Sequence, residues 1–103
     1  MKKEITENNK LIAGFMGKEI YQHIHESNYH CSWDWLMSVV EKIEKIDDGK
    51  YDVAILQDGT QIMIWDTRTK IVDITNALVY FETKIEATYK AVVEFIKWYN
   101  ENK

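Results

Sequence analysis

The residues that most suggest chemistry lie close together in the first half of the sequence: His30, Cys31, Trp33 and Trp35. An imidazole and a thiol can act as base and nucleophile, but side chains adjacent in sequence usually point apart, so we expect no catalytic pair here. Residues two apart on a helix are separated by about 200°, which places Trp33 and Trp35 on opposite shoulders of an apolar face. We interpret His30, Trp33 and Trp35 as candidate ligand-binding residues.

A nucleotide is the ligand that this pattern suits best. Free backbone N–H groups at a helix start attract phosphate, and a flat aromatic ring beside them can stack on a base. Arg68, the only arginine, follows a strand and could form a bidentate contact with an anion. Trp65 completes the set of candidate ligand-binding residues. Asp34 opposes an anion at the helix start, and the alternative is that these tryptophans pack in the core or against a second subunit.

A metal centre and enzymatic chemistry are both less well supported. His23, His25, His30 and Cys31 supply ligand atoms for zinc, but their spacing matches no standard pattern and only one thiolate is present. The carboxylates between residues 41 and 48 lack the apolar neighbours that a general acid needs. The sequence also contains no phosphate-binding glycine loop and no serine-nucleophile or zinc-peptidase motif. We therefore expect no catalytic residues, no metal, no cofactor and a non-enzymatic function.

Composition limits the partners. The net charge of −4 argues against general nucleic-acid binding, which needs a basic surface to replace phosphate counterions. The apolar runs are too short to span a membrane, and the single cysteine fits a reducing cytoplasm, so we expect a cytoplasmic protein. At 103 residues the chain should form one domain. Its 13% aromatic residues exceed what a small core hides, which favours self-association into a homo-oligomer or a lined pocket.

The hydrophobic pattern predicts an α+β fold with a small antiparallel sheet. The predicted elements are helices near 7–16, 32–47 and 83–101, a β-hairpin formed by 51–57 and 60–66, and a strand near 70–74. A short strand near 19–25 and either a strand or a loop at 76–82 remain open. No internal repeat or linker is visible.

Capping residues mark the predicted helix starts. Thr6 can cap the first helix, Ser32 the second, and Thr83 opens the last one. Cys31 and Leu36 flank the second start at the spacing of a hydrophobic staple, which would bury the cysteine.

The hairpin is predicted from Asp58-Gly59, a pair typical of a two-residue turn between strands. Such a loop sets the register: Gln57 opposite Thr60, Ile55 opposite Ile62, and Val53 opposite Ile64. Both faces of this hairpin carry apolar residues. We therefore expect helices on both sides of the sheet or a partner subunit on one of them.

Three segments resemble a set of small uncharacterised phage and prophage proteins: the opening with Leu11–Gly17 (LIAGFMG), residues 29–46 (beginning YHCSWDWLM) and residues 83–101. That set is similar to the phage alpha-beta-alpha sandwich domains. Ser38 departs from it, since proline often occurs there, and the sheet does not match closely. The resemblance implies a phage origin and accessory roles that include interference with host defence. It brings no catalytic residues.

Together these observations predict a phage-type accessory protein that self-associates and binds a small ligand, such as a nucleotide immune signal, to counter host defence. The alternative is a protein–protein inhibitor or adaptor acting on a host factor. A further alternative is a small enzyme in which His25, His30 or Cys31 meets acidic residues in one cleft.

Overall fold

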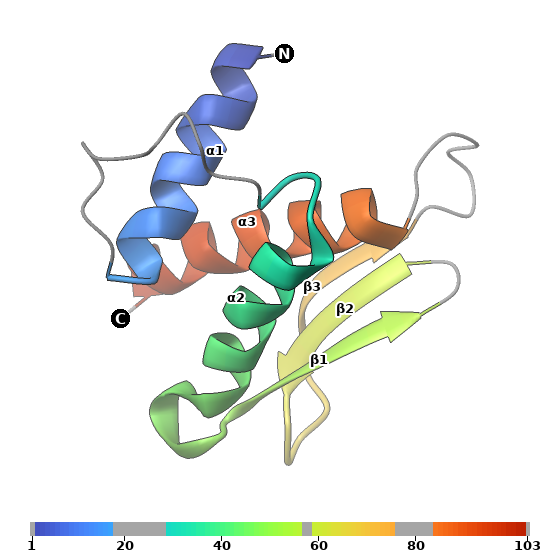
Figure 1. Ribbon diagram of the computed structural model, residues 1–103. Coiled ribbons are helices and arrows are strands. Elements are labelled where there is room, and N and C mark those ends of the chain that lie inside the picture. Colours follow the sequence, from blue (N-terminus) through green and yellow to red (C-terminus); the bar gives the residue numbers. More distant parts are fainter. Residues whose placement is uncertain (1, 18–28, 57–58, 76–83, 103) are drawn as a thin grey trace.

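The computed structural model describes residues 2–17, 29–56, 59–75 and 84–102. Within them it contains three α-helices and a three-stranded antiparallel sheet packed against helices (Figure 1). The predicted α+β class is therefore confirmed. The predictions for 19–25, for 76–82 and for Thr83 lie outside the described residues.

Helix α1 spans Lys2–Phe15, so the predicted start near residue 7 is wrong and Thr6 lies inside the helix. No glycine or proline interrupts residues 2–6, and Ile5 extends the apolar face of Ile12 by two turns. The last helical residue is Phe15, and Gly17 then adopts the expected left-handed conformation with a φ of 79°.

Helix α2 spans Trp33–Lys45, and a 3-10 turn follows over Ile46–Asp48 where the sequence predicted further α-helix. Ser32 occupies the cap position, and its carbonyl accepts the Leu36 N–H at 3.0 Å. Its hydroxyl, however, makes no capping hydrogen bond to the described part of the helix. The predicted apolar stripe is buried: Leu36, Val39, Val40 and Ile43.

The predicted staple between Cys31 and Leu36 is wrong, because Cys31 is exposed while Leu36 is fully buried. Tyr29 takes the place of the cysteine in the core. It is 2% exposed and packs edge-on against Trp35, with 5.0 Å between the ring centroids. The larger apolar surface of the tyrosine ring is buried before the helix starts, and the chain turns the small thiol outward.

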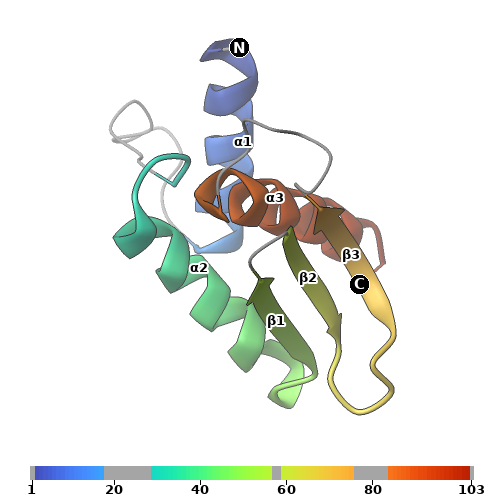
Figure 2. The same ribbon diagram turned by 90° about the vertical axis from the view of Figure 1, so that its right-hand side faces the viewer.

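The sheet has the strand order β1-β2-β3, with β1 at Tyr51–Leu56, β2 at Gly59–Ile64 and β3 at Lys70–Thr75 (Figure 2). The hairpin register differs from the predicted one by two residues. The observed pairs are Tyr51 with Ile64, Val53 with Ile62, Ile55 with Thr60, and Leu56 with Gly59. A shift of two residues leaves every side chain on its predicted face, so the alternating pattern cannot distinguish the two registers.

Helix α3, Lys84–Asn102, is the centre of the core. It packs on β2 and β3 and also contacts α1 and α2, while α2 lies against β1 (Figures 1 and 2). The hydroxyls of Thr60 and Thr88 are both fully buried and hydrogen-bond to each other across the β2–α3 contact at 2.9 Å. The sheet face of Thr60, Ile62 and Val72 is therefore the covered one.

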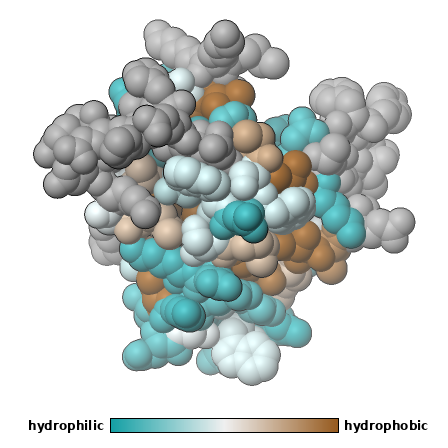
Figure 3. All heavy atoms as spheres, in the orientation of Figure 1, coloured by the Kyte–Doolittle hydropathy of each residue, from teal (hydrophilic) through white to brown (hydrophobic). Residues whose placement is uncertain are grey.

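No described helix covers the opposite face, since α2 and α3 share one core with Ile62 and Val72. Of the two expected arrangements, helices on both sides are not found in the described part of the chain, and a partner subunit on this face stays a prediction. This open face carries Asp52, Ala54, Gln61, Met63 and Asp73, as the strand pairing requires. Hydrophobic residues gather at the surface over the strands in the view of Figure 3. The large apolar side chains that are exposed among the described residues are Trp33, Met37, Leu56 and Trp65.

Candidate ligand-binding site

The candidate ligand-binding residues fall into two groups near opposite ends of α2 (Figure 1). His30, Trp33 and Trp35 surround the start of this helix. Trp65 and Arg68 lie in the turn between β2 and β3, and the Trp65 N–H bonds to the carbonyl of Lys50, shortly after the helix ends. The helix has 13 residues. At about 1.5 Å per residue it is about 20 Å long, so the structure does not bring these residues together in one site.

At the start of α2 the two tryptophans differ as their spacing predicts. Trp35 is half-buried against Tyr29, whereas Trp33 is 39% exposed. The ring of His30 is half-buried, and its Nδ1 accepts a hydrogen bond from the Asn9 side-chain amide at 3.2 Å. Trp35 and His30 thus have structural contacts, which leaves Trp33 as the exposed aromatic of this group.

Asn9 links three parts of the fold. Its side chain is 3% exposed, its Nδ2 donates to His30, and its Oδ1 accepts the Tyr89 hydroxyl at 2.9 Å. This network joins α1, the segment before α2, and α3. The sequence did not lead us to predict that Asn9 and Tyr89 form a buried polar pair. The available signal was an asparagine on the apolar stripe of a helix, between Ile5 and Ile12, where a buried amide needs partners.

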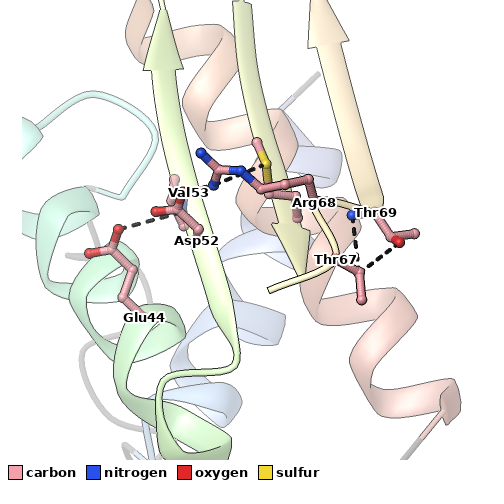
Figure 4. Close-up of polar contacts among 7 residues, drawn as sticks. Glu44, Asp52, Val53, Thr67, Arg68 and Thr69 are labelled. Carbon is pink, nitrogen blue, oxygen red and sulfur yellow. Dashed lines mark hydrogen bonds and ion pairs between the residues drawn. The ribbon is translucent and has the colours of Figure 1, made fainter. Parts of the chain in front are cut away.

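In the β2–β3 turn, Arg68 folds back over the open face of the sheet (Figure 4). Its Nη1 donates to Asp52 Oδ2 at 3.1 Å and lies 3.9 Å from the sulfur of Met63. The guanidinium carbon is 5.6 Å from the ring centroid of Trp65. This distance is within the range of a cation–π contact. The Trp65 side chain is nevertheless 59% exposed.

Hydrogen bonds hold this turn in one conformation. The Arg68 N–H bonds to the Ile64 carbonyl and the Ile64 N–H to the Thr69 carbonyl, both at 2.8 Å. The hydroxyls of Thr67 and Thr69 are 2.8 Å apart (Figure 4). Arg68 itself has a φ of 59°. This left-handed region costs a residue with a Cβ about 1 kcal/mol or more, so the turn fixes an arginine where glycine would fit more easily.

Asp52 belongs to this group, although it was not among the predicted site residues. It lies directly opposite Met63 in the β1–β2 pairing, and Arg68 spans both side chains. The signal in the sequence was the alternation that puts Asp52, Met63 and Trp65 on one strand face. The position of Arg68 above them depends on the turn and could not be read from that pattern.

This group combines the flat ring of Trp65, the hydrogen-bond donors of Arg68 and the acceptor oxygens of Asp52. Among the described residues, no cluster of three or more histidine, cysteine or acidic side chains could hold a metal ion. We define Asp52, Trp65 and Arg68 as the open-face site.

No family model matches this sequence, and no curated protein or solved structure is detectably similar to it. In the described part of the chain, none of the helices combines the length and the apolar character that crossing a membrane requires.

Proposed function

We propose that this protein is a non-enzymatic binding protein and that its open-face site takes a small ligand with a planar ring and a phosphate, such as a nucleotide. The observation that carries the proposal is the left-handed backbone of Arg68. A strained residue persists only where its surroundings hold it, and such residues concentrate at binding and active sites. Here the left-handed turn places the Arg68 guanidinium beside the exposed indole of Trp65.

The energetics favour a ligand that uses both groups. Stacking of a base on an aromatic side chain contributes about 1–3 kcal/mol, which a bare anion lacks. A guanidinium has five N–H donors in a fork that matches phosphate, and the contact with Asp52 occupies one nitrogen. A phosphate can therefore bind this guanidinium while its base lies on the outer face of Trp65.

The test is calorimetric titration of the purified protein with cyclic dinucleotides, cyclic ADP-ribose isomers and nucleoside 5′-monophosphates. Binding by the wild type and its loss in Trp65→Ala and Arg68→Gly would support the proposal. Trp33→Ala is the matched control, since it removes an exposed tryptophan from the other end of α2 and should leave affinity unchanged. Absence of binding heat across the whole panel would overturn the proposal.

The proposal includes a role for such a ligand site in a phage-infected cell, where sequestering a nucleotide immune signal would counter host defence. The resemblance of the first 17 residues and of residues 29–46 and 83–101 to small phage proteins supports this role. Self-association is part of the same proposal, supported by the exposed apolar side chains of Trp33, Met37, Leu56 and Trp65. Light scattering with and without the bound nucleotide measures it, and a strict monomer in both states would remove this part.

A protein–protein inhibitor or adaptor is the second candidate, and a specific feature of α2 favours it. Trp33 and Met37 are spaced one helical turn apart, and both are exposed. Large apolar side chains on one helix face are typical of a surface that contacts another protein. Capture of one host protein in a fixed ratio, lost in a Trp33→Ala/Met37→Ala double variant but kept in Trp65→Ala, would favour this candidate over the nucleotide site.

A further inference from the structure

We infer that Asp52 is an internal competitor for the ligand's phosphate: it occupies Arg68 in the unbound protein and sets the affinity of the open-face site. This inference rests on the proposed function, because it concerns the same site. Its first observation is that Arg68 and Asp52 share one hydrogen bond and not a bidentate pair. One guanidinium nitrogen, Nη1, meets one carboxylate oxygen, Oδ2, at 3.1 Å.

The contact is also accessible to solvent. The Arg68 and Asp52 side chains are 60% and 38% exposed. Water and salt therefore weaken their attraction. Exposed ion pairs of this kind contribute little, typically about 0.2–1 kcal/mol. A ligand thus needs little free energy to displace the carboxylate.

A phosphate has two advantages over the carboxylate in this competition. A phosphate that is free to orient can accept two parallel hydrogen bonds from the guanidinium fork, where Asp52 accepts one, and as a monoester it carries more negative charge than the carboxylate does. The carboxylate meanwhile cancels the charge of Arg68, so the site has little net charge to attract an anion from a distance. Asp52 should therefore weaken binding of every phosphate and make the stacking on Trp65 necessary.

The backbone positions make exchange feasible. Asp52 is fixed on β1 opposite Met63, whereas Arg68 reaches it from the β2–β3 turn through a long, flexible side chain. The guanidinium can swing from the carboxylate to a ligand without any change in the sheet. Its contact with the Trp65 ring keeps it at the site during that exchange.

The experiment compares wild type, Asp52→Asn and Asp73→Asn in titrations with AMP, GMP and the uncharged nucleosides adenosine and guanosine. Asp73 is the matched control. It lies on the same sheet face and is exposed, its substitution removes the same charge, and its ion pair is with Lys70 rather than Arg68. Asn keeps the shape of Asp, so both variants should fold.

We expect Asp52→Asn to bind both monophosphates about two- to fivefold more tightly than the wild type, the range that loss of an exposed ion pair allows. The affinity of Asp52→Asn for nucleosides should change less, and so should the affinity of Asp73→Asn for the monophosphates. The gain should shrink between about 0.1 M and about 1 M salt, because the screening length falls from about 10 Å to about 3 Å.

The outcomes separate the two proposals. Equal affinities in Asp52→Asn and Asp73→Asn, or an equal gain for nucleosides, would overturn the inference and leave the proposed function standing. Weaker monophosphate binding by Asp52→Asn would also overturn it, since the carboxylate would then assist the ligand. If none of the three proteins binds any nucleotide, both the inference and the proposed function fail.

Discussion

Two side-chain hydrogen bonds of Asn9 connect parts of the chain that lie far apart in sequence. The Tyr89 hydroxyl bonds to Asn9 across 80 positions, and the Asn9 amide bonds to His30. Both contacts are short enough to count as hydrogen bonds, and the asparagine is almost fully buried. A buried amide that loses its partners costs more than the bonds contribute when they are made, so these residues should be sensitive to substitution.

Replacing Asn9 with Leu should lower the free energy of unfolding by about 1–3 kcal/mol, because the Tyr89 hydroxyl loses its shorter bond and keeps the longer one to the Ile5 carbonyl, at 3.4 Å, while His30 loses the amide donor. Urea denaturation followed by tryptophan fluorescence measures the change. Asn8→Leu is the matched control in the same helix, where the side chain is only half-buried and the loss should be smaller. Equal losses at the two positions would contradict a special role for the network.

Ionisation of Tyr51 makes the stability of the folded protein depend on pH in the alkaline range. Burial raises its pKa above the ordinary value of 10.0, and the charge and hydrogen bond of Asp47 raise it further. A tyrosine with a raised pKa in the folded state favours folding fully below about pH 10, and this contribution is lost as pH rises through the folded value. Tyr29, whose pKa is also raised by burial, acts in the same direction.

We therefore expect the urea midpoint of the wild type to fall as pH is raised above about 10. In Tyr51→Phe the midpoint at neutral pH should be somewhat lower, because the bond to Asp47 is lost, but its fall at high pH should be shallower. Denaturation curves at several pH values between neutrality and the alkaline limit test this. A fall as steep as that of the wild type would contradict the assignment.

Among the elements, α2 and α3 were easier to predict than the start of α1 or the pairing of the strands. The buried stripe of α2 follows directly from its helical period, and α3 agrees with the predicted 83–101 within one residue at each end. The hairpin register could not be fixed, since a two-residue shift preserves both faces. The staple prediction failed because local spacing does not reveal that Tyr29 competes with Cys31 for the core. The position of Arg68 above Asp52 depends on a turn conformation that no periodic pattern encodes.

The β2–β3 turn allows a direct measurement of backbone strain. Arg68→Gly and Arg68→Ala remove the same contacts with Asp52, Met63 and Trp65, but only glycine relieves the left-handed conformation. We expect the glycine variant to be about 1 kcal/mol more stable than the alanine variant. Calorimetric melting of both proteins tests this. Equal stabilities would show that the arginine conformation stores no strain and would weaken the argument for the open-face site.

In the whole molecule, α3 is surrounded by the rest of the fold. It contacts α1, α2, β2 and β3, and most of its residues from Ala87 to Ile96 are buried. Opening this helix to water therefore requires most of the core to separate. By contrast, β1 forms one edge of the sheet, and its side chains are mostly only half-buried.

Hydrogen exchange should reflect that difference. Amides in the middle of α3 should exchange most slowly, at a rate limited by global unfolding, and those at the outer edge of β1 should exchange faster through local opening. Mass spectrometry of peptides covering 84–102 and 51–56 gives the comparison. Faster exchange in the middle of α3 than in β1 would contradict a core centred on that helix.

The central position of α3 also determines when this protein can fold during synthesis. Among the described elements, α1 makes its main contact with α3, and the covered face of β2 and β3 also packs against α3. Domains generally fold as units once their chain has emerged from the ribosome. Residues 84–102 are translated last among the described elements. The apolar surfaces that pack against α3 therefore stay exposed until this helix has been synthesised. During that interval a chaperone that shields apolar surface would protect the nascent chain from aggregation.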